Sequence, residues 1–193
     1  MHSLRLACLL VLAGTSATAS AALQPGDAAP PFTAQASLAG KPFAYSLAAQ
    51  LARGPVVVYF YPAAYTQGCD IEAHEFSSRI DRFTAAGASV VGVSLDRIER
   101  LNAFSADPDY CAGKLAVASD ADGRIARSFH LQVHAAQGGA KDTRGQEIGH
   151  GFAQRTTFVI RRDGTVAATV GGVAPDENVR RTLEVVEQLA ARR

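Results

Sequence analysis

The fold is decided by one stretch of the sequence, Val56-Val57-Val58-Tyr59-Phe60-Tyr61-Pro62-Ala63-Ala64-Tyr65-Thr66-Gln67-Gly68-Cys69. Its first six residues are a continuous run of β-branched and aromatic side chains, which is typical of a strand buried on both faces in a parallel sheet. Pro62 ends the run, residues 63–68 predict a loop, and from Cys69 the apolar spacing becomes helical. The stretch therefore predicts a strand–loop–helix unit with a cysteine where the helix begins.

The same alternation of strands and helices continues along the chain. In the helix from Cys69 we expect Ile71, Phe76, Ile80 and Phe83 near one face, with Gly87 ending it. Asp96 followed by Glu99 resembles a capping arrangement, and it predicts a helix with Ile98, Leu101 and Phe104 facing inward. Further elements are predicted as strands at 43–45, 89–94 and 115–118, and as short helices at 47–51, capped by Ser46, and 125–131.

The end of the chain carries an antiparallel signal. Residues 156–160 and 166–170 flank Asp163-Gly164, and Asp-Gly between two strands predicts a hairpin. Pro175 suits the first position of a final helix. In this helix an apolar stripe would be formed by Val179, Leu183, Val186 and Ala190. We predict one α/β domain over residues 22–193, with parallel and antiparallel strands in a central mixed β-sheet flanked by helices.

The first 21 residues predict a secretory signal peptide outside the domain. A short start with Arg5 is followed by an apolar stretch, and the small residues Ala19-Ser20-Ala21 suit cleavage after Ala21. The alternative is a buried N-terminal strand or helix. The sequence does not fit a lipoprotein signal at Cys8, because the apolar stretch lies mostly after this cysteine. We therefore expect an exported protein, periplasmic or secreted.

Composition excludes several classes of function. The 193 residues include 19 Lys or Arg and 18 Asp or Glu, and this near-neutral balance argues against an electrostatic nucleic-acid binder. No apolar run approaches the roughly 18 residues of a membrane span.

Cleavage after Ala21 would leave two cysteines, Cys69 and Cys111, which in an oxidising compartment could form a plain structural disulfide.

Cys69 is the candidate nucleophile. The first turn of a helix carries free N–H groups and a partial positive charge, and both stabilise a thiolate. In such places the pKa of a cysteine falls from about 8.5 to roughly 3.5–7.5, especially near a cation. The alternative is a buried or disulfide-bonded structural cysteine, which is common.

The residues around Cys69 carry a family resemblance. Pro62, Thr66 and Cys69 stand in P-x-x-x-T-x-x-C spacing, which resembles the active-site motif of the peroxiredoxins, thiol peroxidases of the AhpC/TSA-redoxin superfamily with a thioredoxin-like fold. The resemblance runs from about Leu23 to Leu189 and includes the 155–160 stretch Arg-Thr-Thr-Phe-Val-Ile. Residues 68–73 resemble most the bacterioferritin-comigratory, or Q-type, branch.

The resemblance implies a role for each site residue. Cys69 would be the peroxidatic cysteine, whose thiolate attacks a peroxide and becomes a sulfenic acid. Thr66 would offer its hydroxyl to the peroxide, and Pro62 would shield the thiolate from water. Arg155 would supply a fixed cation that favours the thiolate and stabilises charge on the leaving oxygen, and Glu72 would orient Arg155. The alternatives are a surface charge for Arg155 and a solvated helix face for Glu72.

The sequence departs from the Q-type pattern at one position. Many members of this branch carry a second cysteine five residues after the first, and here that position is His74. Cys111 is the remaining candidate to resolve the sulfenic acid as an intramolecular disulfide, which would require local unwinding of the helix unless the two Cα atoms already lie near 6 Å apart. The alternative is an inert Cys111 and recycling of Cys69 by an external thiol.

The expected activity is reduction of hydrogen peroxide or organic hydroperoxides, with a thioredoxin-like or other thiol as reductant, no cofactor and no metal. The protein could act as a monomer or a homodimer. The alternatives are a thiol-disulfide oxidoreductase and a disulfide-stapled or copper-handling module. A thiol-disulfide oxidoreductase would need C-x-x-C at the start of the helix, and the sequence at Cys69 lacks the second cysteine. A copper site is suggested by His130 and His134, whose spacing would place them on one face of a helix. Residues 134–151 predict a long loop that covers the site or varies freely.

Overall fold

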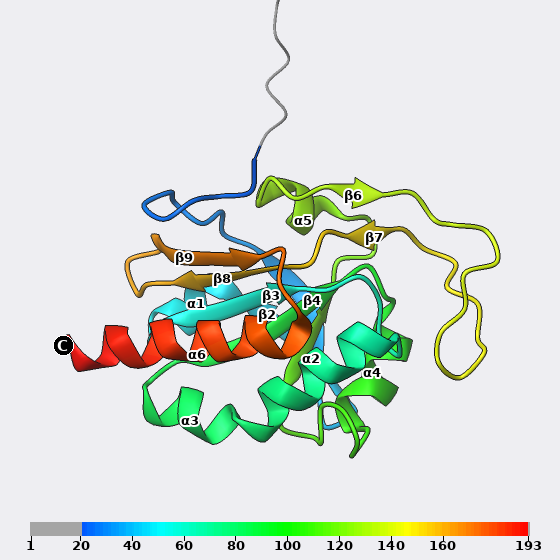
Figure 1. Ribbon diagram of the computed structural model, residues 1–193, viewed down its shortest axis with the longest axis horizontal. Coiled ribbons are helices and arrows are strands. Elements are labelled where there is room, and N and C mark those ends of the chain that lie inside the picture. The colour runs from blue at the N-terminus through cyan, green and yellow to red at the C-terminus, as the bar shows by residue number, and fades with distance from the viewer. Residues whose placement is uncertain (1–20, 193) are drawn as a thin grey trace, which may run out of the picture.

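The computed structural model describes residues 21–192 and consists of a seven-stranded sheet with helices on both faces (Figure 1). In sheet order the strands are β2 (Lys41–Ser46), β1 (Thr33–Leu38), β5 (Ala116–Ser119), β4 (Ser89–Ser94), β3 (Val56–Phe60), β8 (Thr156–Ile160) and β9 (Val166–Gly171). A separate two-stranded sheet contains β6 (Val133–His134) and β7 (Phe152–Ala153). The helices are α1 (Leu47–Leu51), α2 (Gln67–Ser78), α3 (Ile80–Ala85), α4 (Ile98–Ala106), α5 (Arg124–Ser128) and α6 (Pro175–Ala191).

The main sheet is mixed, as predicted. β3 pairs in parallel with β4 and antiparallel with β8, and β4 pairs in parallel with β5. All five residues of β3 are buried, which explains why its sequence is continuously apolar. The predicted hairpin of β8 and β9 is confirmed, with Gly164 at φ 86° in the turn, and so is the last helix, α6, with Pro175 in its first turn.

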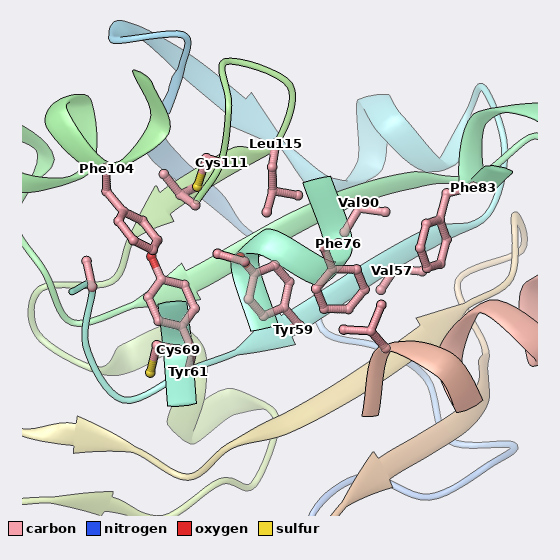
Figure 2. Packing of buried hydrophobic residues seen from close by; sticks show 14 of the residues in the cluster. Val57, Tyr59, Tyr61, Cys69, Phe76, Phe83, Val90, Phe104, Cys111 and Leu115 are labelled. Carbon is pink, nitrogen blue, oxygen red and sulfur yellow. The ribbon is translucent and has the colours of Figure 1, made fainter. Parts of the chain in front are cut away.

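Alternate residues of β3 face two different hydrophobic cores. Val57 and Tyr59 belong to the core under α2, α3, α4 and α6 (Figure 2). Val56 and Val58 belong to the second core, on the side of α1 and α5. Both faces of the sheet are therefore covered by helices. The loop after β3 leads directly into α2.

The helix predicted from Cys69 to Gly87 is two helices. α2 already begins at Gln67, and the backbone breaks at Arg79, with φ −107° and ψ 7°, before α3. Ile71 is 43% exposed rather than buried. Ile71 and Phe76 are five residues apart, which is about 140° around a helix, so both cannot face one core. The earlier start places Cys69 third in α2, still within its first turn.

Two further expectations were wrong or incomplete. Asp96 does not cap α4, because Arg97 occupies the N-cap position and makes no side-chain cap bond there. Strand β1 escaped prediction, and its hairpin with β2 turns at Ala39 and Gly40, both with positive φ. A two-residue hairpin of this kind is signalled most strongly by Asn-Gly or Asp-Gly, and Ala-Gly is a weaker sequence signal.

The predicted signal peptide, residues 1–21, lies outside the described residues except for Ala21. Within residues 21–192, no helix combines the length and the apolar character needed to cross a membrane.

Candidate active site

Cys69 is placed by the β3–loop–α2 unit. Thr66 is the N-cap residue of α2, with extended φ and ψ of −115° and 142°, and Cys69 follows in the first turn. Its side chain belongs to the hydrophobic core cluster, and the residue is 1% exposed. The thiol therefore lies at the positive end of a helix and yet almost completely out of solvent.

Arg155 reaches Cys69 from the neighbouring strand. Phe60, at the end of β3, pairs with Thr156, at the start of β8, so residue 155 lies beside the loop that follows β3. Arg155 Nη2 lies 3.3 Å from Cys69 Sγ, and Nη1 donates to the Gly68 carbonyl at 3.4 Å. The antiparallel register thus brings together two residues that are 86 positions apart.

Glu72 holds the guanidinium from the other side. Its fully buried carboxylate pairs with Arg155 Nη1. Burial raises the pKa of Glu72 to about 7, against the opposing influence of Arg155. The second carboxylate oxygen, Oε1, has no hydrogen-bond partner among the described residues. Glu72 therefore lies where it can orient Arg155, and the alternative of a solvated helix face is excluded.

The pKa of Cys69 reflects two opposing influences. Burial raises it above its ordinary value, and Arg155 is the strongest of the groups that lower it, followed by the Thr66 hydroxyl and the Ala63 backbone. The expectation of a lowered pKa was therefore wrong for this buried arrangement, because it counted the cation and the helix start but not the loss of solvation. In this site the thiolate depends on Arg155.

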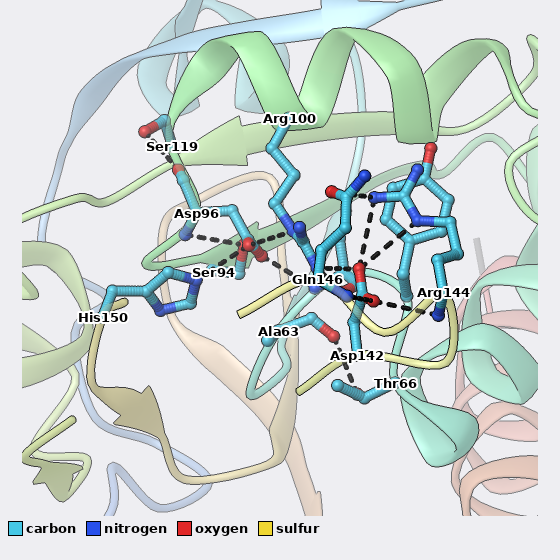
Figure 3. Close-up of polar contacts among 12 residues, drawn as sticks. Ala63, Thr66, Ser94, Asp96, Arg100, Ser119, Asp142, Arg144, Gln146 and His150 are labelled. Atoms are coloured by element: carbon cyan, nitrogen blue, oxygen red, sulfur yellow. Dashed lines mark hydrogen bonds and ion pairs between the residues drawn. The ribbon is translucent and has the colours of Figure 1, made fainter. Parts of the chain in front are cut away.

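Thr66 and Pro62 belong to the loop that leads from β3 into α2, and the Thr66 hydroxyl lowers the pKa of Cys69. Thr66 Oγ1 donates to the Ala63 carbonyl at 2.8 Å, and both residues appear in Figure 3. Pro62 is the second residue after β3, in the same loop, and is partly exposed. The structure thus brings Thr66, Cys69, Glu72 and Arg155 together at the start of α2, with Pro62 in the loop that leads into this helix.

Cys111 lies in the loop after α4. It is a free thiol, as is Cys69, and it is buried in the same core cluster (Figure 2). Burial raises the pKa of Cys111 strongly, and Asp107 and Asp70 raise it further. The loop is fastened to α2 at the Asp109 and Tyr110 carbonyls, by His74 Nδ1 at 3.0 Å and Ser77 Oγ at 2.6 Å.

The histidines do not form the site that their spacing suggested. His130 follows α5 with a φ of 60° and His134 lies in β6, so the two do not share a helix face. Within residues 21–192 no group of three or more His, Cys, Asp or Glu side chains is arranged to hold a metal ion.

Sequence reasoning missed a set of polar contacts that hold the loop before Cys69. Asp96 accepts the Ala64 amide at 2.8 Å, and Thr143 donates its amide to the Tyr65 carbonyl at 2.8 Å. Thr143 comes from the 134–151 segment, which we expected to be a long loop that covers the site or varies freely, and it contacts the loop that precedes Cys69. The only sequence signals were the acidic residues themselves, which also suit ordinary turns.

Comparisons with known proteins agree with this geometry. Residues 25–169 match the model of the AhpC/TSA family. A Mycobacterium tuberculosis protein that carries a provisional peroxiredoxin name is 34% identical over 171 residues, which cover 87% of this chain and 99% of that protein. Peroxiredoxin Q of Sedum lineare chloroplasts is 30% identical over 165 residues, or 85% of this chain and 78% of the relative.

Solved structures give the same result. The crystal structure of peroxidoxin BcpB from M. tuberculosis superposes with a TM-score of 0.71 at 27% identity, covering 86% of this chain and 98% of that one. The bacterioferritin comigratory protein of Xanthomonas campestris, whose structure was studied for alkyl peroxide reduction, gives a TM-score of 0.65 at 26% identity, with 88% and 99% covered.

Proposed function

Because this chain belongs to the AhpC/TSA family and is a peroxiredoxin-type thiol peroxidase, we propose that Cys69 is its peroxidatic cysteine. The observation that carries the proposal is the 3.3 Å contact between Cys69 Sγ and Arg155 Nη2 at the start of α2. A guanidinium stays charged at any physiological pH and presents several donors, so it stabilises a thiolate and an adjacent oxygen at once.

In the first step the Cys69 thiolate attacks one oxygen of the peroxide. An S–O bond forms while the O–O bond breaks, so the sulfur is oxidised to a sulfenic acid. The second oxygen leaves as hydroxide or alkoxide and takes up a proton to become water or an alcohol. Arg155 stabilises the charge that develops on this leaving oxygen, and the Thr66 hydroxyl turns from the Ala63 carbonyl to donate to the bound peroxide. Pro62 limits the access of water to the sulfur.

In the second step Cys111 resolves the sulfenic acid. Its thiol attacks the Cys69 sulfur, a disulfide forms and water leaves, after which a dithiol reductant returns both cysteines to thiols. We propose that in this step the start of α2 unwinds locally and the loop that holds Cys111 releases its hydrogen bonds to His74 and Ser77. All the residues invoked come from one chain, so one copy suffices whether the protein is a monomer or a homodimer.

We propose hydrogen peroxide and small organic hydroperoxides as substrates. Support for the organic class comes from the X. campestris relative, whose structural study concerned alkyl peroxide reduction. We further propose that the protein is exported, on the strength of the signal-like residues 1–21. The N-terminal sequence of the protein recovered from the exported fraction should then begin at Ala22, and an N-terminus at Met1 in that fraction would overturn this part of the proposal.

Mass spectrometry tests the catalytic proposal. The reduced protein is treated with one equivalent of hydrogen peroxide, with and without dimedone, and its peptides are analysed. We expect a dimedone adduct on Cys69 and, without dimedone, a Cys69–Cys111 link that is absent before oxidation. Oxidation of Cys111 alone, with Cys69 still a thiol, would contradict the proposal.

A further inference from the structure

A small turn between β6 and β7, residues 140–148, is built around a buried carboxylate. Asp142 accepts the backbone amides of Arg144 at 2.9 Å and Gln146 at 2.8 Å, and Arg100 Nη2 donates to it at 2.7 Å. Although burial favours the neutral acid, these hydrogen bonds hold the pKa of Asp142 below its ordinary value. Figure 3 shows Arg100 between Asp142 and Asp96, so this turn is rigidly tied to α4.

The tip of this turn contacts the loop that precedes Cys69. Thr143 donates both its amide, at 2.8 Å, and its hydroxyl, at 3.0 Å, to the Tyr65 carbonyl. The Arg144 guanidinium lies over the Tyr65 ring, 3.2 Å from its centroid. In Figure 1 the segment between β6 and β7 lies at the end of the molecule where α2 begins.

The residue before Tyr65 is held equally firmly. Ala64 donates its amide to Asp96 at 2.8 Å and accepts Arg100 Nη2 at its carbonyl, at 2.9 Å. Asp96 is itself fixed by Ser94 Oγ and by His150 Nε2, each at 2.8 Å. Both backbone polar groups of Ala64 are therefore bound by side chains of one network.

Tyr65 needs such support because its backbone is strained. Its φ is 60°, in the left-handed region that is unfavourable for a bulky residue without a special reason. Such conformations persist where the surrounding structure over-determines them, and they are common beside active sites. Here the left-handed turn sets the direction in which the chain enters Thr66 and α2.

We propose that Thr143 and Arg144 are positioning residues for peroxide reduction, because they hold Tyr65 in the conformation that directs Thr66 and Cys69 toward the peroxide. The inference rests on the proposed function of Cys69. Thr143 and Arg144 touch no reacting atom and act through Tyr65. The Thr143 hydroxyl also lies 3.4 Å from Asp70, which follows Cys69, so the same turn reaches both sides of the Thr66–Cys69 segment.

The test compares Thr143→Val with Thr143→Ser in a Cys111→Ser background. Valine matches the shape of threonine but removes the hydroxyl, whereas serine keeps it. The measurements are the rate of Cys69 sulfenic acid formation with hydrogen peroxide, trapped by dimedone, the pH midpoint of Cys69 alkylation, and the melting temperature. Gln137→Ala, an exposed position in the same segment, is the matched control.

We expect Thr143→Val to slow sulfenic acid formation by about three- to tenfold, which is the range of one lost hydrogen bond. Serine should restore the rate. The pH midpoint of alkylation should shift much less than in Arg155→Gln, because Arg155 and Glu72 are untouched. Arg144→Gln should slow the reaction by about two- to fivefold through loss of the contact with the Tyr65 ring.

A rate for Thr143→Val equal to that of Gln137→Ala would overturn the proposal, as would equal losses in the Val and Ser variants or a loss that follows the melting temperature alone. Each of these results leaves the role of Cys69 intact, because the parent protein still forms the sulfenic acid. Failure of the parent itself to form a sulfenic acid at Cys69 would instead overturn the proposed function, and this inference with it.

Discussion

The two cysteines of the described chain share one core but have different neighbours. Both are free, buried thiols whose pKa is raised by burial. Cys69 lies in the first turn of α2 with the Arg155 guanidinium 3.3 Å from its sulfur. Cys111 lies in an irregular loop, where the nearby charges that affect its pKa are the carboxylates of Asp107 and Asp70.

Burial alone does not decide which thiol reacts. An apolar environment disfavours both thiolates, so the sign of the neighbouring charge separates them. A cation at Cys69 favours the thiolate and a peroxide oxygen, whereas carboxylates beside Cys111 disfavour its ionisation. On this view Cys111 acts only after Cys69 has become an electrophilic sulfenic acid.

Exchange of each sulfur for oxygen should separate the two cysteines by the largest effect. Cys69→Ser should abolish peroxide consumption, because serine is too weak a nucleophile at neutral pH. Cys111→Ser should leave the rate of sulfenic acid formation at Cys69 unchanged and should remove only the intramolecular disulfide. Stopped-flow peroxide consumption and dimedone trapping measure the two effects. Peroxide consumption that survives in Cys69→Ser would show that the two thiols had been assigned the wrong way round.

Removal of the cation should give the next largest effect. Arg155→Gln should slow sulfenic acid formation by about 10²- to 10³-fold, since a preorganised donor to a developing oxyanion is lost. Arg155→Lys should retain part of the rate, because it keeps the charge without the two-armed guanidinium. Arg162→Gln, an exposed arginine just beyond β8, is the control and should react normally. Equal rates in the two glutamine variants would remove the distinction between Cys69 and Cys111.

Glu72 opposes the effect of Arg155 on the pKa of Cys69. As pH rises through its pKa of about 7, the carboxylate ionises and adds a negative charge that raises the pKa of Cys69. Glu72→Gln should therefore lower the pH midpoint of Cys69 alkylation. The same change should slow the peroxide reaction by about two- to tenfold, because Arg155 loses a charged partner. A higher alkylation midpoint in Glu72→Gln would be inconsistent with this balance of charges.

The smallest effect concerns access to Cys111. Ser77→Ala removes the 2.6 Å bond to the Tyr110 carbonyl and should speed alkylation of Cys111 by about two- to fivefold. Ser78→Ala is a matched control, because its hydroxyl bonds to Glu75 within α2. Alkylation of Cys69 should be the same in both variants. If Ser78→Ala exposed Cys111 as much as Ser77→Ala did, the loop would not be held by Ser77.

The sequence was sufficient where a feature is local. The buried strand β3, the hairpin turn at Asp163-Gly164 and the helix after Pro175 each follow from neighbouring residues, and all are present. These three features depend on backbone geometry that a short stretch of sequence already encodes. The approach of Arg155 to Cys69 is not local, because the two residues are 86 positions apart. It was expected from the resemblance to the peroxiredoxins, and the pairing of β8 with β3 provides it.

Features that depend on distant partners could not be predicted. Asp96 suits a helix cap by spacing, but its side chain turns instead to the Ala64 amide, 32 positions away. Thr143 meets Tyr65 across 78 positions, and no pattern in the 134–151 segment marks that contact. The pKa of Cys69 was misjudged for a related reason, because the burial of its sulfur results from packing by several elements at once.

The central claim is that Arg155 makes Cys69, rather than Cys111, the ionisable thiol. The most direct test is the pH titration of Cys69, followed by thiolate absorbance in a Cys111→Ser background, with Arg155 intact and as Arg155→Gln. The account predicts a clearly higher pKa in the glutamine variant, because burial then acts without its main opponent. Titration curves that coincide with and without Arg155 would contradict it.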